Sequence, residues 1–330
     1  MSNKILLSLI VVFYLTGLLT VSASSIFVPE NYTTIQQGVD NANPGDAVIV
    51  GDGTYEENIE VNKRSTIESR NGSANCVIRA KATDSHVLKV TEGGVNITGF
   101  SLTGTTRFEK AGVYLEASNC NISNNEVYGN EVGIFLANAS ANTINNNTVS
   151  QNGYATLVRY SNSNILARNI FSAGQYGVTI RYSHENILFH NQVFGNNYGI
   201  YIAYSKGNTI YLNNFIENNK VVFSRSTTSW NTTEPVPYNY TGKSCEGYMG
   251  NYWHDYQGTD GNADGIGDTP YEVTGSTHVL MEPFENYSVE RDLPTRNPTP
   301  IPTTTGIEIP GFTIVVAVCG LLLAIILGRR

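Results

Sequence analysis

The sequence predicts an all-β fold, namely a right-handed parallel β-helix with coils of about 22 residues, a short N-terminal capping helix and a C-terminal membrane helix. Three observations lead to this fold. A repeat recurs at a nearly constant period, each repeat contains three strand-like segments, and asparagine occupies the same positions in successive repeats. A fixed period of this length is typical of a solenoid of strands and turns.

The repeats occupy residues 112–220, and four of the five open on a glycine followed by isoleucine or valine, in segments related to Gly-Ile-x-Leu. An Asn-x-Ile segment and an Asn-x-Val/Phe segment follow, so each repeat supplies three extended stretches. Alternation within the first stretch directs Ile134 and Leu136 to one side and Phe135 to the other. Three stretches per coil predict a prism whose coils stack about 4.8 Å apart. The repeats begin at Gly112, Gly133, Ala155, Gly177 and Gly199.

Asparagine forms two columns when the repeats are aligned. Stacked side-chain amides can hydrogen-bond along a column, and asparagine tolerates the left-handed backbone conformation of a corner. We therefore expect these asparagines to be structural, with ligand binding by the exposed ones as the alternative. The first column is Asn142, Asn164, Asn186 and Asn208, and the second is Asn147, Asn169, Asn191 and Asn213.

Residues 1–24 predict a secretory signal peptide. Lys4 precedes a long apolar run, and small residues follow that run, with cleavage expected near Ala23 or Ser24. A retained membrane anchor is the alternative. Both interpretations place the rest of the chain outside the cytoplasm.

Residues 25–288 are the predicted β-helix ectodomain, and a short helix is expected to close its N-terminal end. Thr34 can cap this helix, which carries Ile35, Val39 and Ala42 on one face. The strand-like segments of the first coils follow the helix.

The C-terminal region predicts a stalk and a membrane-directed tail. Residues 289–309 are rich in proline and threonine, a composition typical of an extended stalk. Residues 310–330 begin with Pro310, Gly311 and Phe312, continue as an apolar segment and end in two arginines. This tail resembles the PGF-CTERM sorting signal of archaeal surface proteins. The resemblance implies recognition by an archaeosortase and replacement of the apolar segment by a lipid, with a plain transmembrane anchor as the alternative.

Composition narrows the classes of function and modification. A formal net charge of −8 argues against a nucleic-acid partner, because phosphate binding needs a surplus of lysine and arginine. Cys76 and Cys120 adjoin apolar segments and are expected to pack as small hydrophobic residues. Several acceptor sites for N-linked glycans are expected to be used in an exported chain. These sites are Asn31, Asn71, Asn96, Asn121, Asn138, Asn146, Asn231, Asn239 and Asn286.

A broader resemblance covers about residues 27–285. The N-terminal segment TTIQQGVDNANPGDAVIVGDGTY, the GIYL…NTI…NN repeats and the ending GNYWHDYQGTDGNADGIGDTPY resemble NosD-type β-helix surface proteins of archaea. The resemblance implies the fold strongly. It implies function weakly, because NosD itself is tied to copper-site maturation of an exported enzyme.

Carbohydrate-active β-helix enzymes need clustered carboxylates, and this chain offers few. No aspartate occurs between Asp84 and Asp255, and the glutamates of the repeats are scattered. A copper site needs imidazole or soft sulfur ligands in a cluster. The histidines are spread along the sequence at His86, His184, His190, His254 and His278.

The best candidate metal site is the segment 260–268, which reads DGNADGIGD and matches the start of a calcium-binding loop. Tyr271 stands where such a loop ends in glutamate, so the match is incomplete. The alternative is an Asp- and Gly-rich turn that closes the domain. The expected calcium ligands are Asp260, Asn262, Asp264, the carbonyl of Ile266, and Asp268.

A column of Tyr160, Tyr182 and Tyr204 lies beside Arg159 and Arg181 in the aligned repeats. These tyrosines are candidates for contact with glycans. The alternative is that they only stack on one another and fill the structure. We expect a non-catalytic surface protein with a structural, adhesive or glycan-binding role in the archaeal cell envelope. The alternatives are a polysaccharide lyase or hydrolase and a NosD-like accessory protein for exported copper enzymes.

Overall fold

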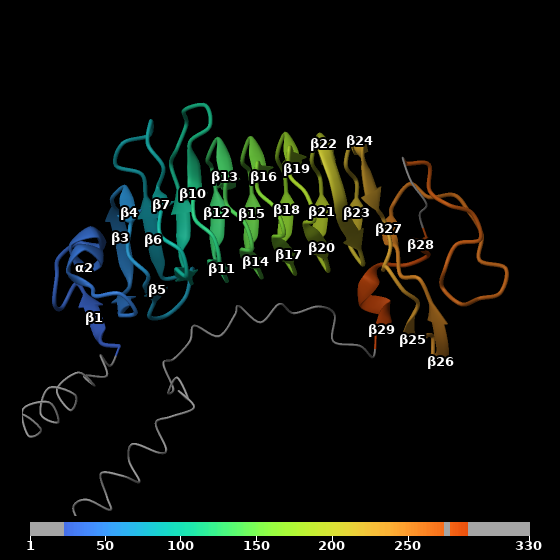
Figure 1. Cartoon of the computed structure of the whole chain (residues 1–330), viewed down its shortest axis with the longest axis horizontal. Helices are drawn as coiled ribbons and strands as arrows, with labels where there is room; N and C mark the ends of the chain where they lie inside the picture. Colours follow the sequence, from blue (N-terminus) through green and yellow to red (C-terminus); the bar gives the residue numbers. More distant parts are fainter. Residues whose placement is uncertain (1–22, 274–277, 290–330) are drawn as a thin grey trace, which may run out of the picture. The chain divides into compact units, whose positions relative to one another are not determined.

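The computed structural model describes residues 23–273 and 278–289, which form a parallel β-helix with three sheet faces (Figure 1). Strands of successive coils pair in parallel on each face, as the repeats predict. On the first face β1 (Ser25–Val28) pairs with β2, and later coils add one strand each. These are β2 (Ala47–Val50), β5 (Thr66–Ser69), β8 (Asn96–Thr98), β11 (Asn121–Ser123), β14 (Thr143–Asn145), β17 (Ile165–Ala167) and β20 (Ile187–Phe189).

The second face contains ten strands in one sheet. They are β3 (Gly53–Glu56), β6 (Cys76–Arg79), β9 (Ser101–Thr103), β12 (Glu126–Tyr128), β15 (Thr148–Ser150), β18 (Ile170–Ser172), β21 (Gln192–Phe194), β23 (Asn214–Ile216), β27 (Asn251–Trp253) and β28 (Val279–Leu280).

The third face carries the Gly-Ile-x-Leu segments of the repeats. Its strands are β4 (Ile59–Val61), β7 (Leu88–Val90), β10 (Ala111–Leu115), β13 (Val132–Ala137), β16 (Tyr154–Arg159), β19 (Tyr176–Arg181), β22 (Tyr198–Tyr211) and β24 (Lys220–Ser229). The long strands β22 and β24 turn the corner from the third face to the first face of the next coil.

The helix α2 (Ile35–Asn41) closes the N-terminal end of the solenoid, as the sequence predicts. Thr34 accepts a hydrogen bond from the backbone of Gln37 and caps the helix, and the carboxylate of Glu57 accepts from its first two backbone N–H groups. The Gln36 side-chain amide accepts a hydrogen bond from the Glu60 backbone N–H and donates one to the Glu60 carbonyl. This side chain therefore replaces a neighbouring strand along the open edge of β4.

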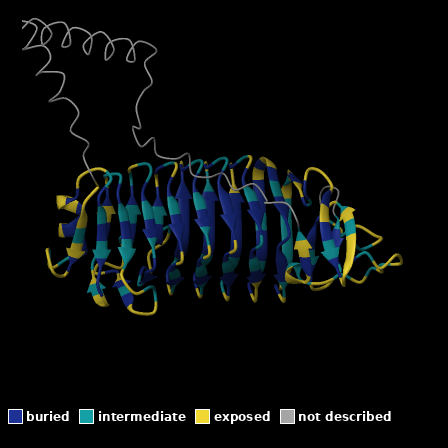
Figure 2. Ribbon diagram, turned by 90° about the horizontal axis from the view of Figure 1, so that it is seen from below, coloured by how far each residue is buried: buried dark blue, intermediate teal, exposed yellow. Residues whose placement is uncertain are grey.

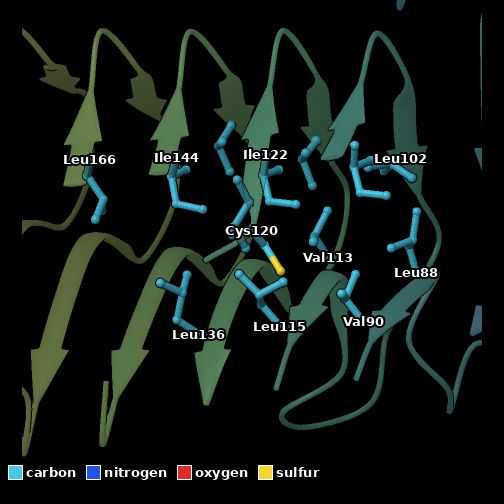
Figure 3. Close-up of a cluster of buried hydrophobic side chains, with 14 of the residues drawn as sticks. Leu88, Val90, Leu102, Val113, Leu115, Cys120, Ile122, Leu136, Ile144 and Leu166 are labelled. Atoms are coloured by element: carbon cyan, nitrogen blue, oxygen red, sulfur yellow. The ribbon is translucent and has the colours of Figure 1, made fainter. Parts of the chain in front are cut away.

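Buried apolar side chains fill the inside of the prism. Figure 2 shows buried residues along the strands and exposed residues at the turns. Leucine, isoleucine and valine of successive coils stack in the core, and Cys120 lies among them (Figure 3). Cys76 and Cys120 are both buried, which confirms their predicted packing as small hydrophobic residues.

The two predicted asparagine columns are buried hydrogen-bonded ladders. Asn142 donates from its backbone and side-chain nitrogens to Oδ1 of Asn164, at 2.9 and 3.1 Å, and the same pair of bonds recurs up to Asn208. The second ladder extends beyond the predicted column, from Asn125 to Asn251. At each step the amide closes a corner and satisfies backbone groups of two coils.

A third ladder was not predicted. Asn130 donates to Asn152, and Asn196 donates to Asn218, at the corner between the second and third faces. Gly174 occupies the intervening coil and donates its backbone N–H to Asn196. Gly174 has no side-chain amide and therefore breaks the asparagine column in the sequence. Its backbone N–H still bonds Asn196, so the ladder of hydrogen bonds continues in the structure.

The chain departs from the β-helix in a small antiparallel sheet, which the sequence did not predict. It consists of β25 (Val236–Tyr240), β26 (Lys243–Gly247) and β29 (Tyr287–Val289), the last of which follows the 3₁₀ helix η1 (Phe284–Asn286). Thr241 and Gly242 both have positive φ and form the two-residue turn of the hairpin.

The predicted signal peptide and C-terminal membrane helix lie outside the described residues, apart from the last residues of the signal segment. Within the part of the chain that the structure describes, no helix has the length and apolar character needed to cross a membrane.

We expect Asn147→Ala to lower the free energy of unfolding by about 3 kcal/mol or more, because each buried polar group left without a partner costs about 1–3 kcal/mol. The Asn147 side chain accepts two bonds from Asn125 and donates to three acceptors, including Asn169. Urea unfolding followed by circular dichroism measures the loss. Asn146→Gly is the control, because Asn146 is exposed and its φ of 52° suits glycine. Equal losses of unfolding free energy in the two variants would contradict a dominant contribution of the asparagine ladder to stability.

Candidate functional site

The outward side of the third face carries a column of arginines, because equivalent positions of successive coils stack. Arg159 on β16 pairs in register with Arg181 on β19, and the column continues through Ala203 on β22 to Arg225 on β24. Arg181 and Arg225 are exposed. The spacing of parallel strands, about 4.8 Å, brings these cationic side chains onto one surface.

Aromatic rings lie beneath and beside these arginines. The guanidinium of Arg181 lies 5.9 Å from the ring centroid of Tyr201, and that of Arg225 lies 5.2 Å from Phe223. The Tyr201 and Phe223 rings stack at 4.6 Å. Such contacts hold a guanidinium flat over a ring while its N–H groups stay accessible.

A second aromatic column was not predicted. Tyr154, Tyr176 and Tyr198 stack on the same face, with centroid distances of 4.7 and 4.9 Å. The ammonium of Lys220 lies over the Tyr198 ring and donates a hydrogen bond to the Tyr198 hydroxyl at 3.1 Å. We call this part of the surface, formed by Arg181, Tyr198, Tyr201, Lys220, Phe223 and Arg225, the arginine–tyrosine face.

The structure brings together the predicted column of Tyr160, Tyr182 and Tyr204 at the corner after the third face. The rings stack nearly parallel, 5.1 and 4.8 Å apart, and their exposures are 53%, 38% and 61%. Because the rings cover one another, the inner ring faces are closed to a ligand. Only the outer ring faces of Tyr160 and Tyr204, together with the ring edges, can contact a sugar.

The third face is covered around Phe135 on β13. Phe135 points to the side opposite Ile134 and Leu136, as predicted, and only 1% of its surface is exposed. Arg159 lies 4.8 Å from its ring centroid and forms a bidentate ion pair with Glu109, which belongs to the segment before β10. The hydrogen bonds from Arg159 hold the pKa of Glu109 below its usual value, although partial burial opposes this effect.

The Glu109–Arg159 pair makes a testable contribution to stability. A carboxyl whose pKa is lowered by folding stabilises the protein above its unfolded pKa of about 4.3, and this contribution is lost as the pH falls through the folded pKa. We therefore expect Glu109→Gln to melt about 2 °C below the unmutated protein at pH 7, since a partly exposed pair contributes little. The two proteins should converge toward pH 3. A difference that does not change with pH contradicts this origin.

The predicted calcium loop is an ordered turn that packs against the antiparallel sheet. Asp260 accepts from the backbone N–H groups of Asp264 and Gly265, and Asp268 accepts from that of Gly261. Tyr287 donates to the Gly265 carbonyl at 2.6 Å. Gly265 has a φ of 88°, and a Cβ there would lie 2.8 Å from atoms of two tyrosine rings.

The predicted metal ligands do not converge in this arrangement. Among the residues that the structure describes, no three His, Cys, Asp or Glu side chains form a group that could hold a metal ion. His184 accepts a hydrogen bond from the backbone of Lys206. His86 stacks on Tyr114 and His190 packs against Phe284, and burial lowers the pKa of both imidazoles to about 4.

The predicted glycan acceptors fall into two groups. Asn31, Asn71, Asn138, Asn146 and Asn286 are exposed, mostly at corners and turns. The others are half-buried: Asn96, Asn121, Asn231 and Asn239. Asn96 and Asn121 lie opposite one another on the first face. Within the exposed group, the side-chain nitrogens of Asn71, Asn146 and Asn286 donate to Asp52, Asn124 and Glu282.

Residues 39–258 match the model of a family described as periplasmic copper-binding protein (NosD). Residues 309–330 match the PGF-CTERM motif and include the predicted Pro-Gly-Phe tripeptide. A cell surface glycoprotein of Methanothermus fervidus is 32% identical to this chain over 127 residues, which are 37% of this chain and 20% of that protein. The chain therefore matches about a fifth of the length of this curated relative.

Solved structures are similar to this chain at low sequence identity. An alginate lyase from Paenibacillus is 17% identical, with a TM-score of 0.39, over 62% of this chain and 94% of that chain. The enzymatically active domain of tailspike protein 2 from bacteriophage CBA120 is 15% identical, with a TM-score of 0.46, over 59% and 39%. Pectin methylesterase from carrot is 10% identical, with a TM-score of 0.42, over 63% and 89%. These likenesses are too distant to bear on function.

Proposed function

The chain belongs to the NosD family, and from that premise we propose that it is a non-catalytic β-helix protein of the archaeal cell envelope, with a structural or adhesive role in binding glycans. The observation that carries the proposal is the arginine–tyrosine face. It combines cations held over rings with half-buried aromatic side chains on one face of the β-helix.

The surface location has its own support. The PGF-CTERM match and the likeness to an archaeal cell surface glycoprotein agree with the predicted export and confirm a surface protein anchored through its C-terminal tail. We further propose that an archaeosortase processes this tail. The partners are then envelope components or glycans outside the membrane.

The chemistry of the face suits a polar, ring-containing ligand. Arg181 and Arg225 form no ion pair within the described residues, so their N–H groups can bind hydroxyl or carboxylate oxygens. Tyrosine and phenylalanine edges beside them supply apolar contact for the C–H groups of a sugar. A packed β-helix provides this surface without the cost of ordering loops on binding.

The carboxylates near this face do not favour catalysis. A glycan-cleaving enzyme needs a positioned acid whose pKa is raised so that it can give up a proton. Glu109 has the opposite environment, because Arg159 lowers its pKa and keeps it ionised. A lyase or hydrolase activity is the competing function.

The described residues do not fit a copper site. Copper requires clustered imidazole or sulfur ligands, whereas the histidines here pack separately against rings and backbone groups. A role as an accessory to exported copper enzymes gains no support from the side chains.

We expect replacement of both Arg181 and Arg225 by glutamine to weaken binding to glycans extracted from archaeal envelopes at least tenfold, measured on a glycan array and by calorimetry. Replacement of Tyr160, Tyr182 and Tyr204 by asparagine tests the corner column separately. Arg79→Gln on the exposed side of the second face is the matched control. Unchanged binding in both variants contradicts the proposed surface, and unsaturated or shortened glycan products contradict a non-catalytic role.

We also propose that Ca²⁺ binds the loop 260–268. The donors would be oxygens only, from Asp260, Asn262, Asp264, Asp268 and the Ile266 carbonyl, which is the ligand type that Ca²⁺ prefers. Binding requires Asp268 to exchange the N–H of Gly261 for the ion. The turn at Gly265, where φ is 88°, supports the proposal, because calcium-binding loops carry a glycine at this position.

Millimolar Ca²⁺ should raise the melting temperature of the ectodomain by several degrees, since a ligand at about 100 times its dissociation constant adds about 2.7 kcal/mol. Asp264→Asn keeps the shape of the side chain and should abolish most of the shift. Equimolar Mg²⁺ is the ionic control. The absence of any Ca²⁺-specific shift leaves the loop as a structural turn.

A further inference from the structure

We propose that the glycan attached to Asn138 packs its first sugar against the ring of Tyr160. The tyrosine column would then bind the protein's own glycan at one end. Asn138 begins the acceptor sequence Asn-Ala-Ser and is exposed. The proposal uses the corner column but does not depend on binding of any external glycan.

The register places Asn138 one coil before Tyr160 at the same corner. The preceding residue, Ala137, pairs with Arg159, and the N–H of Asn138 donates to the Arg159 carbonyl at 3.1 Å. Tyr160 makes the same bond to the Arg181 carbonyl, at 3.2 Å. Both residues have a φ of 53°. Because the backbone is the same, the two side chains leave the corner in the same direction.

One face of the Tyr160 ring is turned toward Asn138. Tyr182 covers the other face, with ring centroids 5.1 Å apart and planes inclined by 17°. No aromatic ring of the described residues covers the side toward Asn138, and 53% of the Tyr160 surface is exposed. A pyranose linked to Asn138 can place its C–H face on this ring, and so bury apolar surface from both partners.

Asn146 supplies a control within the same coil. It is also an exposed acceptor with a φ of 52°, and it also donates its backbone N–H to the next coil, to the Ala167 carbonyl. The corner residue of that next coil is Arg168 rather than tyrosine. The side-chain nitrogen of Asn146 donates to Asn124 in the structure, and a glycan at Asn146 shares the backbone geometry of Asn138 but has no tyrosine in the next coil to pack against.

The arrangement also assigns different roles to the two ends of the column. A sugar on Asn138 closes the outer face of Tyr160. Tyr204, which is 61% exposed, keeps its outer face open at the other end. An external glycan would then meet the column at Tyr204.

The test is a double-mutant cycle on ectodomain produced in an archaeal host that attaches N-linked glycans. Peptide mass spectrometry should first show that Asn138 is occupied. Asn138→Gln should then lower the melting temperature by about 2 °C when Tyr160 is present, and by less than 1 °C when Tyr160 is replaced by asparagine. Tyr160→Phe keeps the ring and should keep the coupling.

The controls separate the glycan from the fold. Asn146→Gln should act additively with Tyr160→Asn, and bacterial protein without glycans should show no coupling at Asn138. An empty Asn138, additive effects in the glycosylated protein, or equal coupling without glycans would overturn the proposal. None of these outcomes depends on the binding assays of the arginine–tyrosine face.

Discussion

Buried side-chain amides at the corners set the geometry on which the rest of this protein depends. A corner in a solenoid turns backbone N–H and carbonyl groups away from the sheet ladders, and burying them without partners is costly. Asn169 illustrates the solution, because it accepts from both nitrogens of Asn147, donates to Asn191 and bonds the Ile144 carbonyl. A shift of register by one residue would leave all these groups unpaired. The amide ladders therefore fix which residues of successive coils face one another.

Because the register is fixed, residues at equivalent positions of successive repeats form columns on the surface. The inward positions can vary among aliphatic residues, but Gly133 cannot carry a side chain, since a Cβ would lie 2.4 Å from Val149 and 2.6 Å from the Ala155 carbonyl. The outward positions are free of this constraint. Arginine and tyrosine recur there at the strand spacing, which is why cations and rings gather on one face of the coils that contain β16, β19, β22 and β24.

Much of this could be predicted from the sequence, because the repeats carry the information locally. The two unbroken asparagine columns and the corner tyrosines follow from aligned positions, and the capping helix follows from its N-cap Thr34 and its apolar face. The third ladder escaped prediction because Gly174 interrupts it, although Asn152 and Asn196 stand at the same position of their repeats. The Glu109–Arg159 pair could not be foreseen, since it joins residues 50 positions apart through a loop that interrupts the repeat pattern. The antiparallel sheet also lies outside that pattern.

The stacked tyrosines show how the fold limits its own ligands. Rings stacked at the strand spacing cover each other's faces. A column therefore exposes ring edges along its length and full ring faces only at its two ends. A sugar that stacks on a face must therefore approach from an end of the column, while one that lies along the solenoid meets edges and the neighbouring guanidinium groups. Tyr160 faces an acceptor asparagine and Tyr204 does not. The two ends of the column are thus chemically different, although both arise from the same repeat.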